Sequence, residues 1–220
     1  MSDVMQGSAT SSDEFPRNVF VLCTGRCGST TFARACSRLE GWTAGHETRT
    51  HLVGPDRLAY PDGHIEADNR LSWFLGRLTE TWGDRAAYVH LTRDREEVAR
   101  SYAARAGQGI VRAYRGDILL NLTARQPDMP ILDVCLDYVD TVTANIENFL
   151  QHRRHVLPVR LETIRDDFEI FLGWIDAQGD TGAAQVELRR RHNATKVEKF
   201  EPLTRETGAP NDHKRFDDRI

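Results

Sequence analysis

The sequence has no apolar run long enough to cross a membrane as a helix. About 18 consecutive apolar residues are needed, and polar or charged residues interrupt every apolar stretch of the 220-residue chain well before that length. The opening stretch, MSDVMQGSATSSDEFPRN, has neither the basic segment nor the apolar segment of a secretory signal peptide. We therefore expect a cytoplasmic protein without a membrane partner.

Cysteine is scarce and its spacing is uninformative. The four cysteines are Cys23, Cys27, Cys36 and Cys135, and they form neither a C-x-x-C pair nor a disulfide framework. We expect reduced thiols and no metal site, because no cluster of ligand residues is visible. Basic residues are not in excess either: the net charge is -4, so nucleic acid is not an expected partner. The sequence does not indicate the oligomeric state.

The composition is that of an ordinary globular protein, with 40% hydrophobic and 28% charged residues. No internal repeat or long linker is present, and the length suits one α/β domain. We expect a disordered lead-in over residues 1–16, a single domain over 17–200, and a polar tail or flap over 201–220.

Short apolar runs alternate with segments of helical periodicity. The runs predict strands at 18–23, 42–46, 86–92 and 155–162, and the periodic segments predict helices at 29–39, 69–81, 95–106, 132–152, 165–176 and 182–192. This order indicates a three-layer α/β fold, with a doubly wound, mainly parallel sheet. In such sheets ligands bind at the carboxyl ends of the strands.

The first strand leads into a loop suited to an anion. Gly25 and Gly28 permit tight turns and close approach of the backbone to a ligand. The segment from Gly28 through Ser29, Thr30 and Thr31 opens the first helix, whose backbone N–H groups and dipole favour an anion. Arg26 adds a positive charge with a planar set of donors.

This loop lacks the lysine of a nucleotide-triphosphate P-loop. The pattern G-x-x-x-x-G-K-[ST] is not met from Gly25 onward, in glycine spacing or in lysine. A magnesium-holding aspartate should follow a strand. The closest candidate by sequence is Asp94, which Arg93 separates from its strand. These missing residues count against a P-loop kinase of small molecules. That kinase and a non-catalytic nucleotide-binding module are kept as the alternatives.

The stretch TGRCGSTT resembles the 5′-phosphosulfate-binding loop of sulfotransferases that use 3′-phosphoadenosine 5′-phosphosulfate. That loop has the form [K/R]-x-G-[ST]-[ST], and Arg26, Cys27, Gly28, Ser29 and Thr30 match it in order. Many members carry a tryptophan directly afterwards that stacks on adenine. Here Thr31 stands at that place, so the adenine contact has to come from elsewhere.

A second stretch, YVHLTRDREEVARSYAAR, is similar to the element with which the same family binds the 3′-phosphate. In that element a strand ends in Arg-Asp and a serine follows eight residues after the arginine, as Arg93 and Ser101 do. The resemblance implies a P-loop-like sulfotransferase fold. It also implies sulfuryl transfer to a hydroxyl of a small-molecule or carbohydrate acceptor, with adenosine 3′,5′-bisphosphate as product and no metal.

The resemblance also implies a base that removes the acceptor's proton. Some members use a glutamate just after the second strand, about 20 residues past the basic residue of the loop. Glu47 stands 21 residues after Arg26 and is the expected base, while its neighbour His46 is the rival. Adjacent strand residues face opposite ways, so only one should point into the cleft. Arg26 is expected to stabilise the charge that develops on the leaving oxygen.

Overall fold

The computed structural model describes residues 15–189. A five-stranded parallel sheet forms its centre, in the order β3-β4-β1-β5-β6. The strands are listed here with their bounds: β1 Val19–Leu22, β3 Thr43–His46, β4 His64–Ala67, β5 Ala87–Thr92 and β6 Val156–Arg160. Since β1 occupies the central position, all four of its residues are buried, which accounts for their uniformly apolar character.

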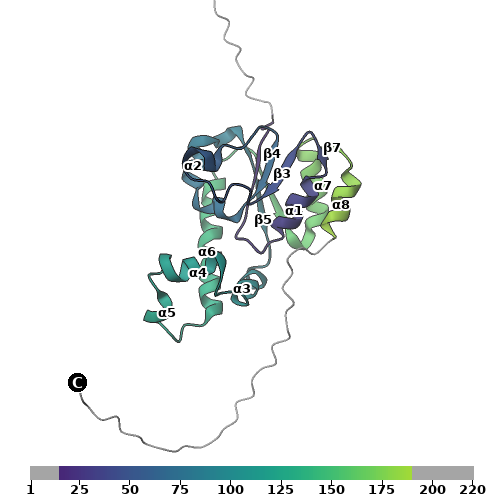
Figure 1. Ribbon diagram of the computed structural model, residues 1–220. Coiled ribbons are helices and arrows are strands. Elements are labelled where there is room, and N and C mark those ends of the chain that lie inside the picture. Colours follow the sequence, from purple (N-terminus) through teal and green to yellow (C-terminus); the bar gives the residue numbers. More distant parts are fainter. Residues whose placement is uncertain (1–14, 190–220) are drawn as a thin grey trace, which may run out of the picture.

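Helices flank both faces of this sheet. On one side, α1 (Ser29–Cys36) contacts α8 (Thr181–Leu188), which contacts α7 (Ile164–Trp174). On the other side, α3 (Arg95–Ala103) packs along α6 (Ile131–Leu150). Figure 1 shows the two groups on opposite sides of the strands, with α2 (Leu75–Thr81) near the end of α6 that lies beside the sheet. The expected α/β architecture with a mainly parallel sheet is thus confirmed.

Side-chain spacing explains how the helices dock. The buried residues of α6 recur every three or four positions: Val134, Cys135, Tyr138, Val139, Val142, Ile146, Phe149 and Leu150. In α1 the ring of Phe32 meets Phe168 and Phe171 of α7 edge-to-face, with ring centroids 5.4 and 5.0 Å apart. Burial of these aromatic rings holds α1, and the loop before it, in a fixed position against the sheet.

Four predicted strands and most predicted helices are confirmed, with ends that shift by up to three residues. Two predictions need correction. The first helix ends at Cys36 rather than at residue 39, because Leu39–Glu40 (β2) pairs antiparallel with Gln178–Gly179 (β7). The continuous helix expected over 69–81 is divided into a 3-10 turn, Asn69–Trp73, and α2.

Several elements were not expected from the sequence. The most consequential is β4, which lies between β3 and β1. The others are α4 (Gly109–Ala113), a π-helical turn (Tyr114–Ile118), α5 (Leu122–Arg125), and short 3-10 turns at Gly54–Leu58, Gly83–Arg85 and Leu161–Thr163. The tail predicted over 201–220, almost all of the lead-in predicted over 1–16, and the last residues of the helix predicted over 182–192 lie outside the described residues.

No helix of the described part is both long and apolar enough to span a bilayer. All four cysteines are free and buried, in agreement with the expectation of reduced thiols.

Candidate functional site: an arginine-lined phosphate loop

The loop after β1 has a left-handed backbone at three of four successive positions. Gly25, Arg26 and Gly28 have φ angles of 84°, 60° and 86°. Glycine is required at two of them for space as well. A Cβ atom on Gly25 would lie 2.2 Å from the hydroxyl of Tyr102, and one on Gly28 would lie 2.7 Å from Leu161. Of these three residues, only Arg26 has a side chain, and the left-handed conformation is unfavourable for an L-residue.

Two tyrosines fix the start of this loop. The hydroxyls of Tyr102 and Tyr138 both donate to the carbonyl oxygen of Thr24, at 2.7 and 3.0 Å. Burial raises the pKa of both phenols, so both remain protonated donors at neutral pH. Because N–H and C=O of a trans peptide point in opposite directions, this clamp also sets the direction of the Gly25 N–H.

The helix that follows presents an uncapped N-terminus. Gly28 is its N-cap, and among the described residues no side chain bonds the first-turn N–H groups. The imidazole Nε2 of His46 lies 3.0 Å from the hydroxyl of Ser29 and 3.3 Å from that of Thr30. Ser29 and Thr30 were expected to face the anion and His46 was the rival base, and the structure brings the three side chains together at the end of β3.

Two other residues of the predicted loop, Cys27 and Thr31, have buried side chains. The thiol of Cys27 donates to the carbonyl of Gly25 at 3.1 Å and is 1% exposed, so its side chain faces inward. Thr31 is also buried. Their N–H groups remain candidate contacts for an anion, whereas their side chains do not.

The two motifs found in the sequence meet in space. Arg26 Nε donates to the hydroxyl of Ser101 at 3.0 Å, and Arg93 Nη1 donates to the carbonyl of Arg26 at 3.2 Å. Burial lowers the pKa of Arg26, and the positive charges of Arg105 and Arg93 lower it further. Three guanidinium groups are thus gathered beside one loop. The sequence pattern missed Arg105, although it lies only four residues beyond Ser101, just after the end of α3.

The position of Arg93 is held by the turn that follows β5. Asp94 caps α3 by accepting from the N–H of Glu97 at 2.9 Å. The N–H of Asp94 in turn donates to the carboxylate of Glu162 at 2.7 Å. Glu162 lies just after β6, so it ties the end of that strand to the turn that carries Arg93.

Glu47 lies in the same region but faces a different partner. Its φ is 56°, and its Oε2 pairs with Nη1 of Arg70 at 2.7 Å. His46 and Glu47 therefore point to different groups, as expected for neighbours at the end of a strand. Of the two, His46 contacts the hydroxyls of Ser29 and Thr30, just after the loop that follows β1. The sequence pattern gave Arg70 no role, because the strand before it was not recognised.

Asp68 directly follows β4, which lies next to β1 on the side opposite β5. Asp94, the closest candidate for holding magnesium by sequence, follows β5 after Arg93, so both aspartates come after strands that flank β1. The sequence pattern missed Asp68 because β4 was not recognised. Both Asp68 oxygens are engaged, however: Oδ2 takes a 2.5 Å bond from Arg57, and Oδ1 accepts from the N–H of Arg70 at 2.8 Å. Asp68 also caps the 3-10 turn Asn69–Trp73.

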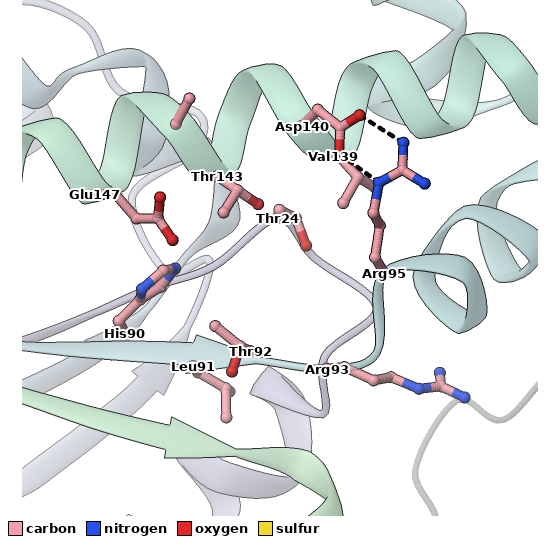
Figure 2. A pocket seen from close by; sticks show the side chains of 11 residues that line it. Thr24, His90, Leu91, Thr92, Arg93, Arg95, Val139, Asp140, Thr143 and Glu147 are labelled. Atoms are coloured by element: carbon pink, nitrogen blue, oxygen red, sulfur yellow. Dashed lines mark hydrogen bonds and ion pairs between the residues drawn. The ribbon is translucent and has the colours of Figure 1, made fainter.

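A cavity of about 250 Å³ lies between β5 and α6, and its lining includes Arg93 and Thr24. Figure 2 shows the Arg93 side chain directed away from it and the Arg95–Asp140 ion pair at one end. Residues of both elements line it, including His90, Thr92, Thr143 and Glu147. His90 is half-buried, and burial lowers its pKa.

Within residues 15–189, no group of three or more His, Cys, Asp and Glu side chains is arranged to hold a metal ion. Comparison of the chain with protein-family models and with curated proteins finds no match.

Proposed function

We propose that the protein is a sulfotransferase that moves a sulfuryl group from 3′-phosphoadenosine 5′-phosphosulfate to an acceptor hydroxyl. The observation that carries this proposal is the contact of Arg26 with Ser101, together with that of Arg93 with the Arg26 backbone. A helix N-terminus and an arginine cluster share one loop. Such a loop suits a ligand with two anionic groups, one on each side.

Each end of the donor has chemically suitable partners. The N–H groups and hydroxyls at the start of α1, from Gly28 to Thr30, suit the 5′-phosphosulfate. Arg93 and Ser101 suit the 3′-phosphate, and Arg105 adds charge beside them. Arg26 stands between the two groups, where its charge opposes the negative charge that grows on the leaving phosphate oxygen.

We propose Glu47 as the base. Its side chain is 30% exposed, and Arg70 contacts one carboxylate oxygen, Oε2, so the other oxygen has no partner among residues 15–189 and suits an acceptor hydroxyl. His46 is placed differently. Its Nε2 sits against the hydroxyls of Ser29 and Thr30, which suits a contact with the transferring group rather than with the acceptor. The acceptor is a hydroxyl-bearing small molecule or carbohydrate of the cytoplasm.

A small-molecule kinase is the weaker proposal. Phosphoryl transfer from Mg–ATP relies on a carboxylate that holds the metal. Asp68 stands at the expected place but is fully buried and bonded to Arg57 and to the backbone of residue 70. No observation on the described residues favours the kinase over the sulfotransferase.

Thermal unfolding with different nucleotides tests the proposal. A ligand at 100 times its dissociation constant stabilises the native state by about 2.7 kcal/mol. Adenosine 3′,5′-bisphosphate should raise the melting temperature more than adenosine 5′-monophosphate or Mg–ATP does. Labelled donor incubated with a panel of hydroxylated acceptors should then give labelled product. Stabilisation by Mg–ATP alone would favour the kinase, and stabilisation without turnover would favour a binding module.

A further inference from the structure

A buried carboxylate on β4 anchors the turn that carries Glu47. Glu66 is fully buried and accepts three hydrogen bonds. The backbone N–H and the hydroxyl of Thr48 each donate to it at 2.7 Å, and Nε2 of His64 contacts it at 2.9 Å. A carboxylate without such partners would be costly to bury. Burial alone would raise its pKa, but the bonds from His64 and Thr48 outweigh it, and the pKa is lowered.

The anchored turn is strained. Glu47 has a left-handed backbone, which a non-glycine residue adopts only where its surroundings impose it. Its own N–H donates to the carbonyl of Ala67 at 3.2 Å, and the next N–H, that of Thr48, is held by Glu66. Both peptide groups that flank Glu47 are therefore tied to β4, and the direction of its side chain is set by these ties.

The remaining contacts leave the anchor little freedom. A Cβ atom on Gly45 would lie 2.2 Å from the methyl group of Thr48 and 3.0 Å from Glu66 Oε2, so the turn folds back closely on β3. On the other side, His64 Nδ1 lies 2.8 Å from the hydroxyl of Thr43, and its ring stacks on Tyr60 at 5.4 Å. The imidazole is thus held at Nδ1 by Thr43 and at Nε2 by Glu66.

We propose that Glu66 acts through Thr48 as a positioning residue that holds Glu47 toward the acceptor. This inference rests on the proposed function, in which Glu47 is the base. A loss of the Thr48 hydroxyl removes one of the two ties between Thr48 and Glu66. A displacement of about 1 Å at a reacting group can cost about 100-fold in rate, so a partial release of the turn should lower kcat about 10- to 100-fold.

Thr48 is exposed, which makes it a safe site for the test. Thr48→Val removes the hydroxyl at constant shape, and Thr48→Ser restores it. Thr79→Val is the matched control, because Thr79 is also exposed, lies on α2 and has a hydrogen-bonded hydroxyl. We expect Thr48→Val to lower kcat with unchanged stabilisation by adenosine 3′,5′-bisphosphate. Thr48→Ser should keep most of the activity, and Thr79→Val should match the unaltered protein.

A double variant shows whether the effect passes through Glu47. If it does, Thr48→Val should lower kcat no further in a Glu47→Gln background. A full additional loss there, or a Thr48→Val rate equal to that of the control, would overturn the positioning role.

Hydrogen exchange at the residue 48 amide gives a readout that does not depend on turnover. This amide should be protected in the unaltered protein and should exchange faster in Thr48→Val. An unprotected amide would overturn the anchor itself. A protected amide in a protein that transfers no sulfuryl group would overturn the proposed function, and Glu66 would then remain only an anchor of the turn.

Discussion

Arg26 combines a left-handed backbone with a charged side chain, and two substitutions separate these features. Arg26→Ala removes the guanidinium but keeps a Cβ atom at φ 60°. Arg26→Gly removes both. Each variant loses the bond to Ser101 and the unfavourable proximity to Arg93 and Arg105, so these contributions cancel when the two variants are compared.

The size of the difference follows from the backbone. A left-handed conformation costs an L-residue roughly 1–2 kcal/mol, and glycine escapes this cost. Against it, glycine makes the unfolded chain more flexible than alanine does, which costs about 0.4–1 kcal/mol of stability. Arg26→Gly should therefore be more stable than Arg26→Ala by about 0.5–1 kcal/mol. For a chain of this length that corresponds to roughly 1–4 °C in melting temperature.

Urea unfolding of both variants measures the difference, and a nucleotide titration separates it from function. Adenosine 3′,5′-bisphosphate should stabilise the two variants to the same reduced extent, because both lack the guanidinium. If Arg26→Ala proves as stable as Arg26→Gly, the left-handed conformation is not retained in solution and the strain argument is refuted. Unequal nucleotide affinities would show instead that the backbone conformation contributes to binding.

Three further outcomes are expected. Arg93→Ala should weaken adenosine 3′,5′-bisphosphate by roughly 2–3 kcal/mol, as for a lost charged hydrogen bond, while calorimetry with adenosine 5′-monophosphate should show little change; equal losses would contradict a 3′-phosphate contact. Glu47→Gln should lower kcat by about 10²–10⁴-fold and His46→Asn by much less, whereas the reverse order in steady-state kinetics would make His46 the base. The pKa of Glu66 is below its usual 4.5, so its ionised form stabilises the fold above that pH, and this contribution is lost as the pH falls through the lowered value. In acid unfolding curves, the stability difference between the unaltered protein and Glu66→Gln should therefore shrink as the pH falls. A constant difference would show that Glu66 does not titrate as proposed.

Local patterns were sufficient for the elements that carry the phosphate loop. The strand before Thr24 is a run of apolar residues, and the turn after it has glycines at two of its three left-handed positions. The helix cap at Asp94 likewise depends only on residues three positions apart. Such features are visible in sequence because their physical causes are local.

The strand β4 could not be predicted in the same way. Its sequence, His-Ile-Glu-Ala, alternates polar and apolar residues as a half-exposed strand would, yet all four are buried. His64 and Glu66 are tolerated in the interior because Thr43 and Thr48, about 20 residues earlier in the chain, complete their hydrogen bonds. Since β4 was not recognised, the roles of Arg70 and Asp68 beside it were missed as well.

Several features of the loop are unfavourable without an anion and become favourable with one. Arg26 is held in a left-handed conformation, and its pKa is lowered by burial and by the charges of Arg105 and Arg93. The first turn of α1 keeps its N–H groups without a side-chain cap among the described residues. A ligand with anionic groups at both ends would reduce the repulsion between the arginines and supply acceptors to the helix. The aromatic packing of α1 and the bonds from Tyr102 and Tyr138 to Thr24 keep the loop in this conformation before an anion binds. Little reorganisation is therefore needed on binding. A nucleotide with only one of the two anionic groups would relieve only one of these costs, which is the physical basis for expecting selectivity for the 3′,5′-bisphosphate.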